Sequence, residues 1–249
     1  MSSERQLDDT NNPWWGEHIH RYEEAAKIIT RRNSNVLDIA CGTGFGSNFL
    51  AELGHNVIGA DISEGAVNEC NNKYKANNLS YEVIDGLKTP FQDEYFEAIV
   101  SFETIEHTTE YIKMLNEFKR VLKKDGVAII STPNFLINSP DGYIVNPYHT
   151  QEWRYNELKE ILESVFKNVE IFGQKYARYD TGKFNYKIGN VFEQIMYLRG
   201  VRKLPISFQD RIMKMVIKKP MYPTKDDYLL VSDVEAIKKC KTFFAICRK

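Results

Sequence analysis

The amino-acid sequence predicts an α/β protein with a doubly wound, mostly parallel sheet. Seven short runs rich in β-branched and aromatic residues lie along the chain, and segments with a helical period separate them over about the first 170 residues. Such alternation indicates βαβ crossovers, which place helices on both faces of a parallel sheet. The expected strands are 36–40, 57–60, 81–84, 98–101, 127–131, 169–172 and 242–247.

The alternation fails between Phe172 and Thr242, and a gap of that length needs structure of its own. Residues 191–198 and 206–217 have helical patterns, so we expect an inserted helical cap over the sheet. We therefore predict one domain over residues 1–249. Its parts are an N-terminal lid (1–30), a ligand-binding core (31–172), a substrate cap (173–230) and the final strand of the core (231–249).

Composition excludes several classes of protein. The chain has 249 residues with 43% apolar residues, enough for a sizeable core, and no apolar run approaches the roughly 20 residues needed to cross a bilayer. The N-terminal dozen residues lack the apolar segment of a secretory signal, and the four cysteines form no CxxC pair. A reduced, cytoplasmic setting is expected. The formal net charge of −1 argues against a dedicated nucleic-acid binder.

Positive charge is concentrated in the predicted cap, where residues 173–230 carry 12 Lys/Arg and 5 Asp/Glu. Three interpretations remain open. In the first, the charge attracts an anionic, phosphate-bearing acceptor. In the second, it belongs to a solvent-exposed face. In the third, the basic and apolar residues of 206–219 contact an anionic membrane surface. The oligomeric state is not predicted.

A glycine-rich loop follows the first expected strand and leads into a helix. Glycines at Gly42, Gly44 and Gly46 allow the backbone to approach a ligand, although a tight turn without a ligand has the same pattern. A dinucleotide fingerprint would need its third glycine one position later. Asp38, at the strand end, would repel a pyrophosphate and attract a cation such as the sulfonium of S-adenosylmethionine.

Two further acids end the next strands. Asp61 lies 19 residues after Gly42, where a carboxylate can accept hydrogen bonds from both ribose hydroxyls. Asp85 follows the third strand and can accept from an exocyclic amine such as adenine N6. Ile62 and Gly86, directly after these acids, are assigned to the same site.

Three stretches of the sequence carry a family resemblance. VLDIACGTGFGSNFLAELGHNVIGADIS, VIDGLKTPFQDEYFEAIVSFETIEH and RVLKKDGVAIISTPN resemble the class I S-adenosylmethionine-dependent methyltransferases over residues 36–134. The resemblance implies a Rossmann-like sheet of seven strands with an antiparallel last strand. It also implies cofactor binding by Gly42, Gly44, Asp61, Asp85 and Phe102.

Shorter matches extend this resemblance. EHIHRY, STPN, NPYHTQEW and TFFAICRK are similar to bacterial methyltransferases of polysaccharide and glycolipid biosynthesis. By the same resemblance, the N-terminal segment is a helix that folds over the cofactor. Arg21 or Tyr22 would then meet the cofactor carboxylate, although ordinary packing against the sheet explains these residues equally well.

An acidic and histidine cluster follows the fourth strand as Glu103-x-x-Glu106-His107, and His149 comes later. In one interpretation, His107 is a general base for an attacking hydroxyl, with Glu106 beside it. In another, Glu103, Glu106, His107 and His149 bind a divalent Mg, Mn or Zn ion, as the similar element of small-RNA 2′-O-methyltransferases does. In the third, the acids cap a helix.

These observations predict an O-methyltransferase that acts on a sugar hydroxyl of a glycan, glycolipid or nucleotide-sugar precursor. Its chemistry would be an in-line transfer, for which alignment of oxygen, methyl carbon and sulfur is the main requirement. A quinone or small-phenol O-methyltransferase is the alternative within this class. A cofactor-binding protein without turnover and a nucleotide-dependent dehydrogenase are the alternatives outside it.

Overall fold

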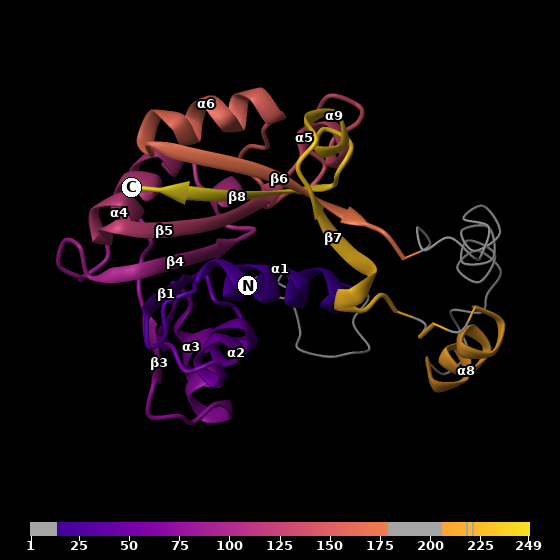
Figure 1. Cartoon of the computed structure of the whole chain (residues 1–249), viewed down its shortest axis with the longest axis horizontal. Helices are drawn as coiled ribbons and strands as arrows, with labels where there is room; N and C mark the ends of the chain where they lie inside the picture. Colours follow the sequence, from indigo (N-terminus) through magenta and orange to yellow (C-terminus); the bar gives the residue numbers. More distant parts are fainter. Residues whose placement is uncertain (1–13, 179–205, 218, 221) are drawn as a thin grey trace. The chain divides into compact units, whose positions relative to one another are not determined.

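The computed structural model describes residues 14–178, 206–217, 219–220 and 222–249 (Figure 1). The described residues fall into two compact units. The first contains Arg21–Lys175 and Leu230–Lys249, and the second contains 14–20 and the described residues of Tyr176–Leu229. All of the candidate site residues predicted from the sequence lie in the first unit.

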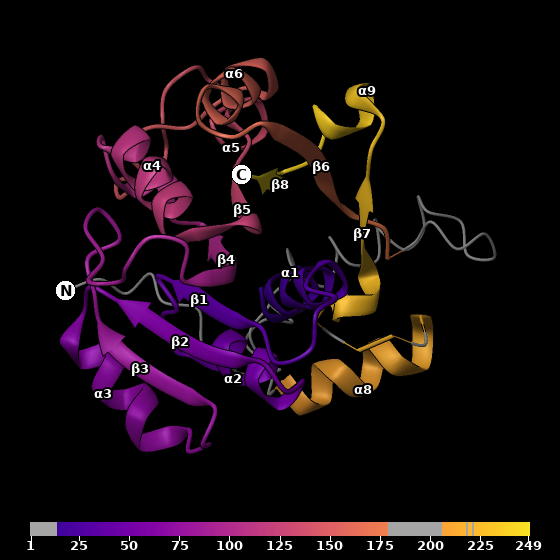
Figure 2. The same cartoon turned by 60° about the vertical axis from the view of Figure 1, so that its left-hand side comes forward.

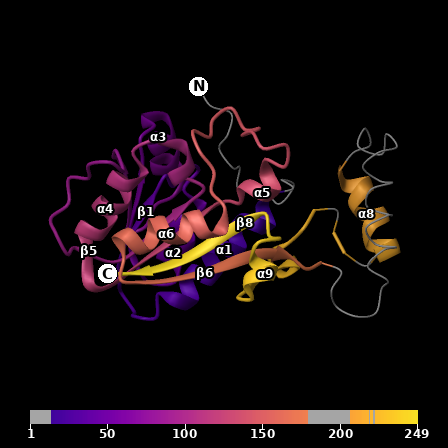
Figure 3. The ribbon, with the colours of Figure 1, turned by 90° about the horizontal axis from the view of Figure 1, so that it is seen from above.

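The sheet has the strand order β3-β2-β1-β4-β5-β8-β6-β7. The first five strands of this order are parallel to one another, and β8 is antiparallel to both β5 and β6. Figure 3 shows β8 and β6 side by side. The strands are β1 (Asn35–Ile39), β2 (Asn56–Asp61), β3 (Leu79–Val83), β4 (Phe96–Phe102), β5 (Leu122–Pro133), β6 (Asn168–Tyr176), β7 (Tyr228–Val231) and β8 (Thr242–Arg248).

Helices cover both faces of the sheet, so alternate residues of one strand enter different cores. Leu37 and Ile99 pack with α4 and α6, whereas Val36 and Val100 pack with α1 and α2 (Figure 2). Burial on both faces explains why these strands read as continuous apolar runs. The helices are α1 (Trp15–Ile28), α2 (Phe45–Glu52), α3 (Glu64–Lys73), α4 (Tyr111–Val121), α5 (Phe135–Asn138), α6 (Tyr155–Val165), α8 (Ile206–Ile217) and α9 (Val234–Ile237).

All seven expected strands are present, but the expected count of seven is wrong because β7 makes the sheet eight-stranded. This strand is the short run Tyr228–Val231, at the end of the interval that we assigned to the cap. Its four residues at the edge of the sheet are too few to give a recognisable pattern.

Within the predicted cap, the helix expected at 206–217 is present as α8. The helix expected at 191–198 lies outside the described residues, so a helical cap over residues 173–230 stays a prediction. None of the described helices has the length and apolar composition needed to cross a membrane.

The third glycine of the loop is explained by packing. Gly46 starts the buried side of α2, and a Cβ at this position would lie 1.9 Å from the Tyr22 ring of α1. Tyr22 is itself buried between Phe45 and Phe102, with ring centroids 5.3 and 4.9 Å away. Gly46 is therefore a packing requirement of α1.

We predict that Gly46→Ala lowers the free energy of unfolding by about 1–3 kcal/mol, because the methyl group must displace the Tyr22 ring from a filled core. Gly65→Ala in α3 is the matched control, since its new Cβ would meet nothing closer than 3.8 Å. The free energy of unfolding of that variant should lie within about 1 kcal/mol of the wild-type value. Equal denaturation midpoints for the two variants would contradict the packing explanation.

Candidate functional site

The glycine loop leaves β1 through a series of left-handed residues. Ala40, Gly42 and Gly44 have φ angles of 59°, 57° and 75°, a region that glycine adopts without strain. The Tyr81 hydroxyl donates to the Gly44 carbonyl oxygen at 2.6 Å and holds the loop from β3. A Cβ at Gly42, by contrast, would meet no atom within 4 Å. The loop is thus fixed on one side and open at Gly42.

Asp61 lies directly beside this open position. Its Oδ2 accepts from the Gly42 N–H at 3.1 Å, and its Oδ1 accepts from the Ser63 N–H at 2.9 Å. The next residue, Ile62, is 74% exposed. Asp85 is exposed at the end of the adjacent strand, and its Oδ1 accepts from the Leu87 N–H at 2.9 Å. The structure therefore brings Gly42, Asp61 and Ile62 together, with Asp85 one strand away.

Asp38 has an internal role in the structure. The carboxyl group is buried, Ser47 Oγ donates to its Oδ2 at 2.6 Å, and the Tyr22 hydroxyl lies 3.2 Å from both oxygens. Burial raises the pKa of Asp38 to about 7, although the hydrogen bonds from Ser47 and Tyr22 oppose the rise. Asp38 thus ties the end of β1 to α1 and α2, and its expected attraction for a cofactor cation stays a prediction.

The other two predicted contacts from α1 and β4 are also buried. Arg21 forms an ion pair with Glu103 (Nη1 to Oε1, 3.2 Å), and its Nε donates to Gln174 Oε1 at 2.7 Å. Phe102 packs edge-on against Tyr22, while Gly86 is packed against Ile39 and Met114. Cofactor contacts of these residues stay predictions.

Glu106 is the most buried acid of the cluster. It lies in a single 3₁₀ turn, Ile105–His107, directly after β4, and its side chain is fully buried. Thr132 Oγ1 donates to its Oε2 at 2.9 Å, but its Oε1 has no hydrogen-bond partner. Burial, and secondarily the nearby Glu103, holds the pKa of Glu106 well above its ordinary value. A buried carboxyl oxygen without a hydrogen-bond partner is energetically costly, and a bound cation or a water molecule would compensate this cost.

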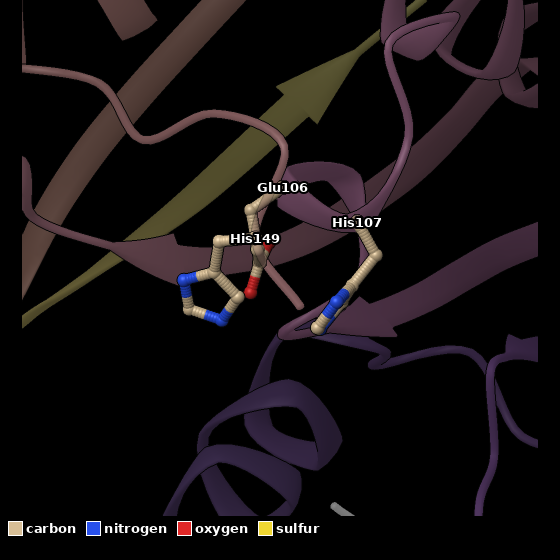
Figure 4. Close-up of side chains that lie close together, drawn as sticks. All are labelled: Glu106, His107 and His149. Atoms are coloured by element: carbon tan, nitrogen blue, oxygen red, sulfur yellow. The ribbon is translucent and has the colours of Figure 1, made fainter. Parts of the chain in front are cut away.

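His149 reaches this cluster through the backbone of the loop that follows α5. The Glu106 carbonyl oxygen accepts from the Thr150 N–H at 2.8 Å and from Thr150 Oγ1 at 3.0 Å. As a result, ligand atoms of Glu106, His107 and His149 all lie within 4.8 Å of one another (Figure 4). The resemblance to the small-RNA 2′-O-methyltransferases implied this proximity, although local spacing alone does not show it, since Glu106 and His149 are far apart in the chain.

Hydrogen bonds fix the two imidazole rings. His107 Nδ1 lies 3.0 Å from the Tyr148 carbonyl oxygen, which can only accept, so Nδ1 carries the proton and Nε2 offers a lone pair. His149 Nδ1 lies 2.7 Å from Glu152 Oε1, and its Nε2 lies 2.9 Å from Asn146 Nδ2. One carboxyl oxygen and two imidazole nitrogens fit Mg²⁺, Mn²⁺ or Zn²⁺.

The fourth predicted ligand, Glu103, lies outside this group in the described part of the chain. Its Oε1 accepts from Ser131 Oγ at 2.8 Å in addition to its ion pair with Arg21. The structure therefore brings together three of the four predicted ligands, and metal binding itself stays a prediction. Sequence reasoning missed Thr132 and Glu152, although the spacing His149-x-x-Glu152 was a signal for the latter.

Comparison with known proteins finds relatives of the strand–helix core of the chain. Residues 37–130 match the family described as a methyltransferase domain. This part of the chain is therefore similar to a methyltransferase domain. A "Probable S-adenosylmethionine-dependent methyltransferase" of Mycolicibacterium smegmatis is 32% identical over 160 residues, which are 64% of this chain and 61% of that protein. The chain thus spans about three fifths of the length of this curated relative.

Two more distant proteins are also similar to this chain. A phthiotriol/phenolphthiotriol dimycocerosates methyltransferase of Mycobacterium tuberculosis (strain H37Rv) is 26% identical over 111 residues, 44% of this chain and 41% of that protein. The crystal structure of a SAM-dependent methyltransferase from Archaeoglobus fulgidus is similar with a TM-score of 0.60 and 18% identity, covering 94% of each chain. This last likeness shows the fold alone, a Rossmann-like, mostly parallel α/β sheet.

We predict that Asp38 makes stability depend on pH. Its pKa is about 7 in the folded protein and about 4 in an unfolded chain, so the folded state binds more protons between these values. This stabilisation is complete below pH 4 and is lost as the pH rises through 7. Relative to Asp38→Asn, the wild type should lose up to about 1.4 kcal/mol of unfolding free energy per pH unit in that window. Unfolding free energies are measured by urea titration at pH 5 to 8. If those of the wild type and Asp38→Asn change with pH in parallel, the raised pKa of Asp38 is contradicted.

Proposed function

We propose that this protein is an S-adenosylmethionine-dependent O-methyltransferase that acts on a sugar hydroxyl of a glycan or glycolipid precursor. The observation that carries the proposal is the cluster of Glu106, His107 and His149 at the carboxyl end of β4. Ligands of open α/β sheets bind outside the carboxyl ends of the strands, and the glycine loop with Asp61 lies at the same edge. Cofactor and acceptor would therefore meet there.

The glycine loop supports S-adenosylmethionine over a dinucleotide. In dinucleotide sites, free backbone N–H groups of the loop bind the pyrophosphate. Here the Gly42 N–H already donates to the Asp61 carboxylate, and a second negative group at that position would be repelled. Asp61 keeps lone pairs for the ribose hydroxyls, and the exposed Ile62 side chain offers an apolar surface for the adenine ring.

The reaction would be an in-line displacement. A bond forms between the acceptor oxygen and the methyl carbon, the bond from that carbon to sulfur breaks, and the hydroxyl proton leaves to a base. Without a bound cation, His107 is the candidate base, because its exposed ring offers an Nε2 lone pair while the Tyr148 carbonyl oxygen holds Nδ1–H. In the alternative, Glu106, His107 and His149 would hold a divalent cation, so that the His107 lone pair is occupied; the cation would lower the pKa of the hydroxyl, whose proton would then pass to water.

The acceptor class is supported by the loop that carries His149. Five large apolar side chains of α5 and of the loop that joins it to α6 are substantially exposed, close in sequence to the site: Leu136, Ile137, Tyr143, Val145 and Tyr148. Exposed apolar residues gathered in one segment are typical of a binding surface. They favour a lipid-linked acceptor over a free nucleotide sugar, and one relative is named for a lipid substrate. The same surface keeps a quinone or small phenol as the second candidate.

The basic cap adds the expectation that the acceptor is anionic or that this segment contacts a membrane peripherally. Eight of the 17 charged residues of the cap lie outside the described residues, and both expectations remain proposals. The proposal includes no nucleic-acid partner, because the net charge of the chain is −1.

Asp61→Ala should weaken binding of S-adenosylhomocysteine by about 1–3 kcal/mol, or roughly 10- to 100-fold, because the ribose hydroxyls lose a charged hydrogen-bond acceptor. Isothermal titration calorimetry of the full chain measures this effect. Asp125→Ala, which alters an exposed acid elsewhere in the chain, is the control and should bind like the wild type. Binding of NAD by the wild type in place of S-adenosylhomocysteine would contradict the cofactor assignment.

Methyl transfer is tested directly with labelled S-adenosylmethionine and a panel of glycolipids, soluble glycans, nucleotide sugars and phenols. We expect label in a lipid-linked sugar, loss of turnover in EDTA, and recovery with a divalent cation. Glu106→Gln should reduce turnover at least 100-fold while leaving cofactor binding unchanged, because the buried amide keeps the shape but loses the anionic ligand. Full activity in EDTA would remove the cation from the proposal, and label in no acceptor would contradict the activity.

A further inference from the structure

Glu152 is a buried acid, and each of its two carboxyl oxygens has a hydrogen-bond partner. Its side chain is 1% exposed, Oε1 lies 2.7 Å from His149 Nδ1, and Oε2 accepts from Ser139 Oγ at 2.7 Å. Ser139 is also buried. Ser139, Glu152 and His149 thus form a continuous chain of hydrogen bonds that ends at a candidate metal ligand.

The other side of the His149 ring determines which nitrogen carries the proton. Asn146 Oδ1 accepts from the Tyr148 N–H at 3.0 Å, so the amide nitrogen of Asn146 is the atom that faces His149 Nε2 at 2.9 Å. An amide N–H donates, and Nε2 must therefore accept. The proton of the neutral ring is on Nδ1, pointing at Glu152.

The backbone of this segment is held without Glu152. The Glu106 carbonyl oxygen accepts from Thr150, and the backbone of Trp153 pairs with Asn134, with the Phe135 N–H donating to the Trp153 carbonyl oxygen at 3.0 Å. Burying a carboxyl group is costly unless a specific partner compensates. Because these backbone hydrogen bonds already hold the loop, Glu152 is not needed for that purpose. We infer that its carboxyl group orients the His149 imidazole.

We propose that Glu152, supported by Ser139, is a positioning residue that fixes His149 with its Nε2 lone pair available to a divalent cation. The inference rests on the cation site of the proposed function. Histidine ligands generally donate their second ring N–H to a carboxylate or carbonyl, and loss of that partner weakens metal binding about 10- to 100-fold. Cation binding would replace the hydrogen bond between Asn146 and His149 Nε2.

The experiment titrates Mn²⁺ into the chelator-treated full chain, with calorimetry and the electron paramagnetic resonance signal of free Mn²⁺ as readouts. Glu152→Gln should raise the Mn²⁺ dissociation constant about 10- to 100-fold, because an amide can donate as well as accept and no longer selects the Nδ1–H form of the ring. Ser139→Ala should raise it less. Glu160→Gln, at an exposed position of α6, is the matched control and should bind like the wild type.

Folding and cofactor binding separate this role from a purely structural one. Metal-free Glu152→Gln should keep the melting temperature of the wild type to within a few degrees and its affinity for S-adenosylhomocysteine. Equal Mn²⁺ affinity of Glu152→Gln and the wild type would overturn the positioning role alone. Failure of the wild type to bind Mn²⁺ would overturn the cation site, and the positioning role with it.

Discussion

The candidate acceptor site depends on one backbone carbonyl group. The carbonyl oxygen of Glu106 accepts from both the N–H and the hydroxyl of Thr150, at 2.8 and 3.0 Å, and so joins two segments 44 residues apart. A carboxyl oxygen of the same residue lies within 4.8 Å of ligand atoms of both histidines, and its Oε1 has no hydrogen-bond partner. Backbone and side chain of Glu106 thus act together, because the bonds that bring His149 close also fix its distance from the carboxyl group.

Adjacent residues of α1 link this site to the glycine loop. Tyr22 bonds Asp38 at the end of β1, and Arg21 pairs with Glu103 at the end of β4. Tyr22, Asp38 and Arg21 are buried and Glu103 is half-buried, and removal of one partner of a buried charged group costs more than at the surface. The helix that was expected to cover the cofactor therefore also fixes the two strand ends between which the reaction would take place.

Sequence patterns located the strand ends, because apolar runs and their spacing report where buried strands begin and end. All seven expected runs are strands, and Asp61 lies beside Gly42 as the spacing indicated. The patterns could not show which acids have internal partners. Asp38 and Glu103 are engaged by residues of α1, and this packing is invisible in the local sequence.

Glu152 and β7 were missed for related reasons. The role of Glu152 is visible only when His149 is placed against Glu106, and β7 is a strand of four residues that is defined by its neighbour in the sheet. The local sequence pattern therefore predicts the helices and strands and the polar residues at the ends of the strands. The pairing of charges, which decides the chemistry of each carboxyl group, depends on tertiary structure.

Crystals grown with S-adenosylhomocysteine and Mn²⁺ give the most direct measurement of this arrangement. At a wavelength where manganese scatters anomalously, the account predicts a single strong peak bound by Glu106 Oε1, His107 Nε2 and His149 Nε2, with Glu103 still paired to Arg21. No peak in that cluster, with the nucleoside bound at Gly42, would contradict it.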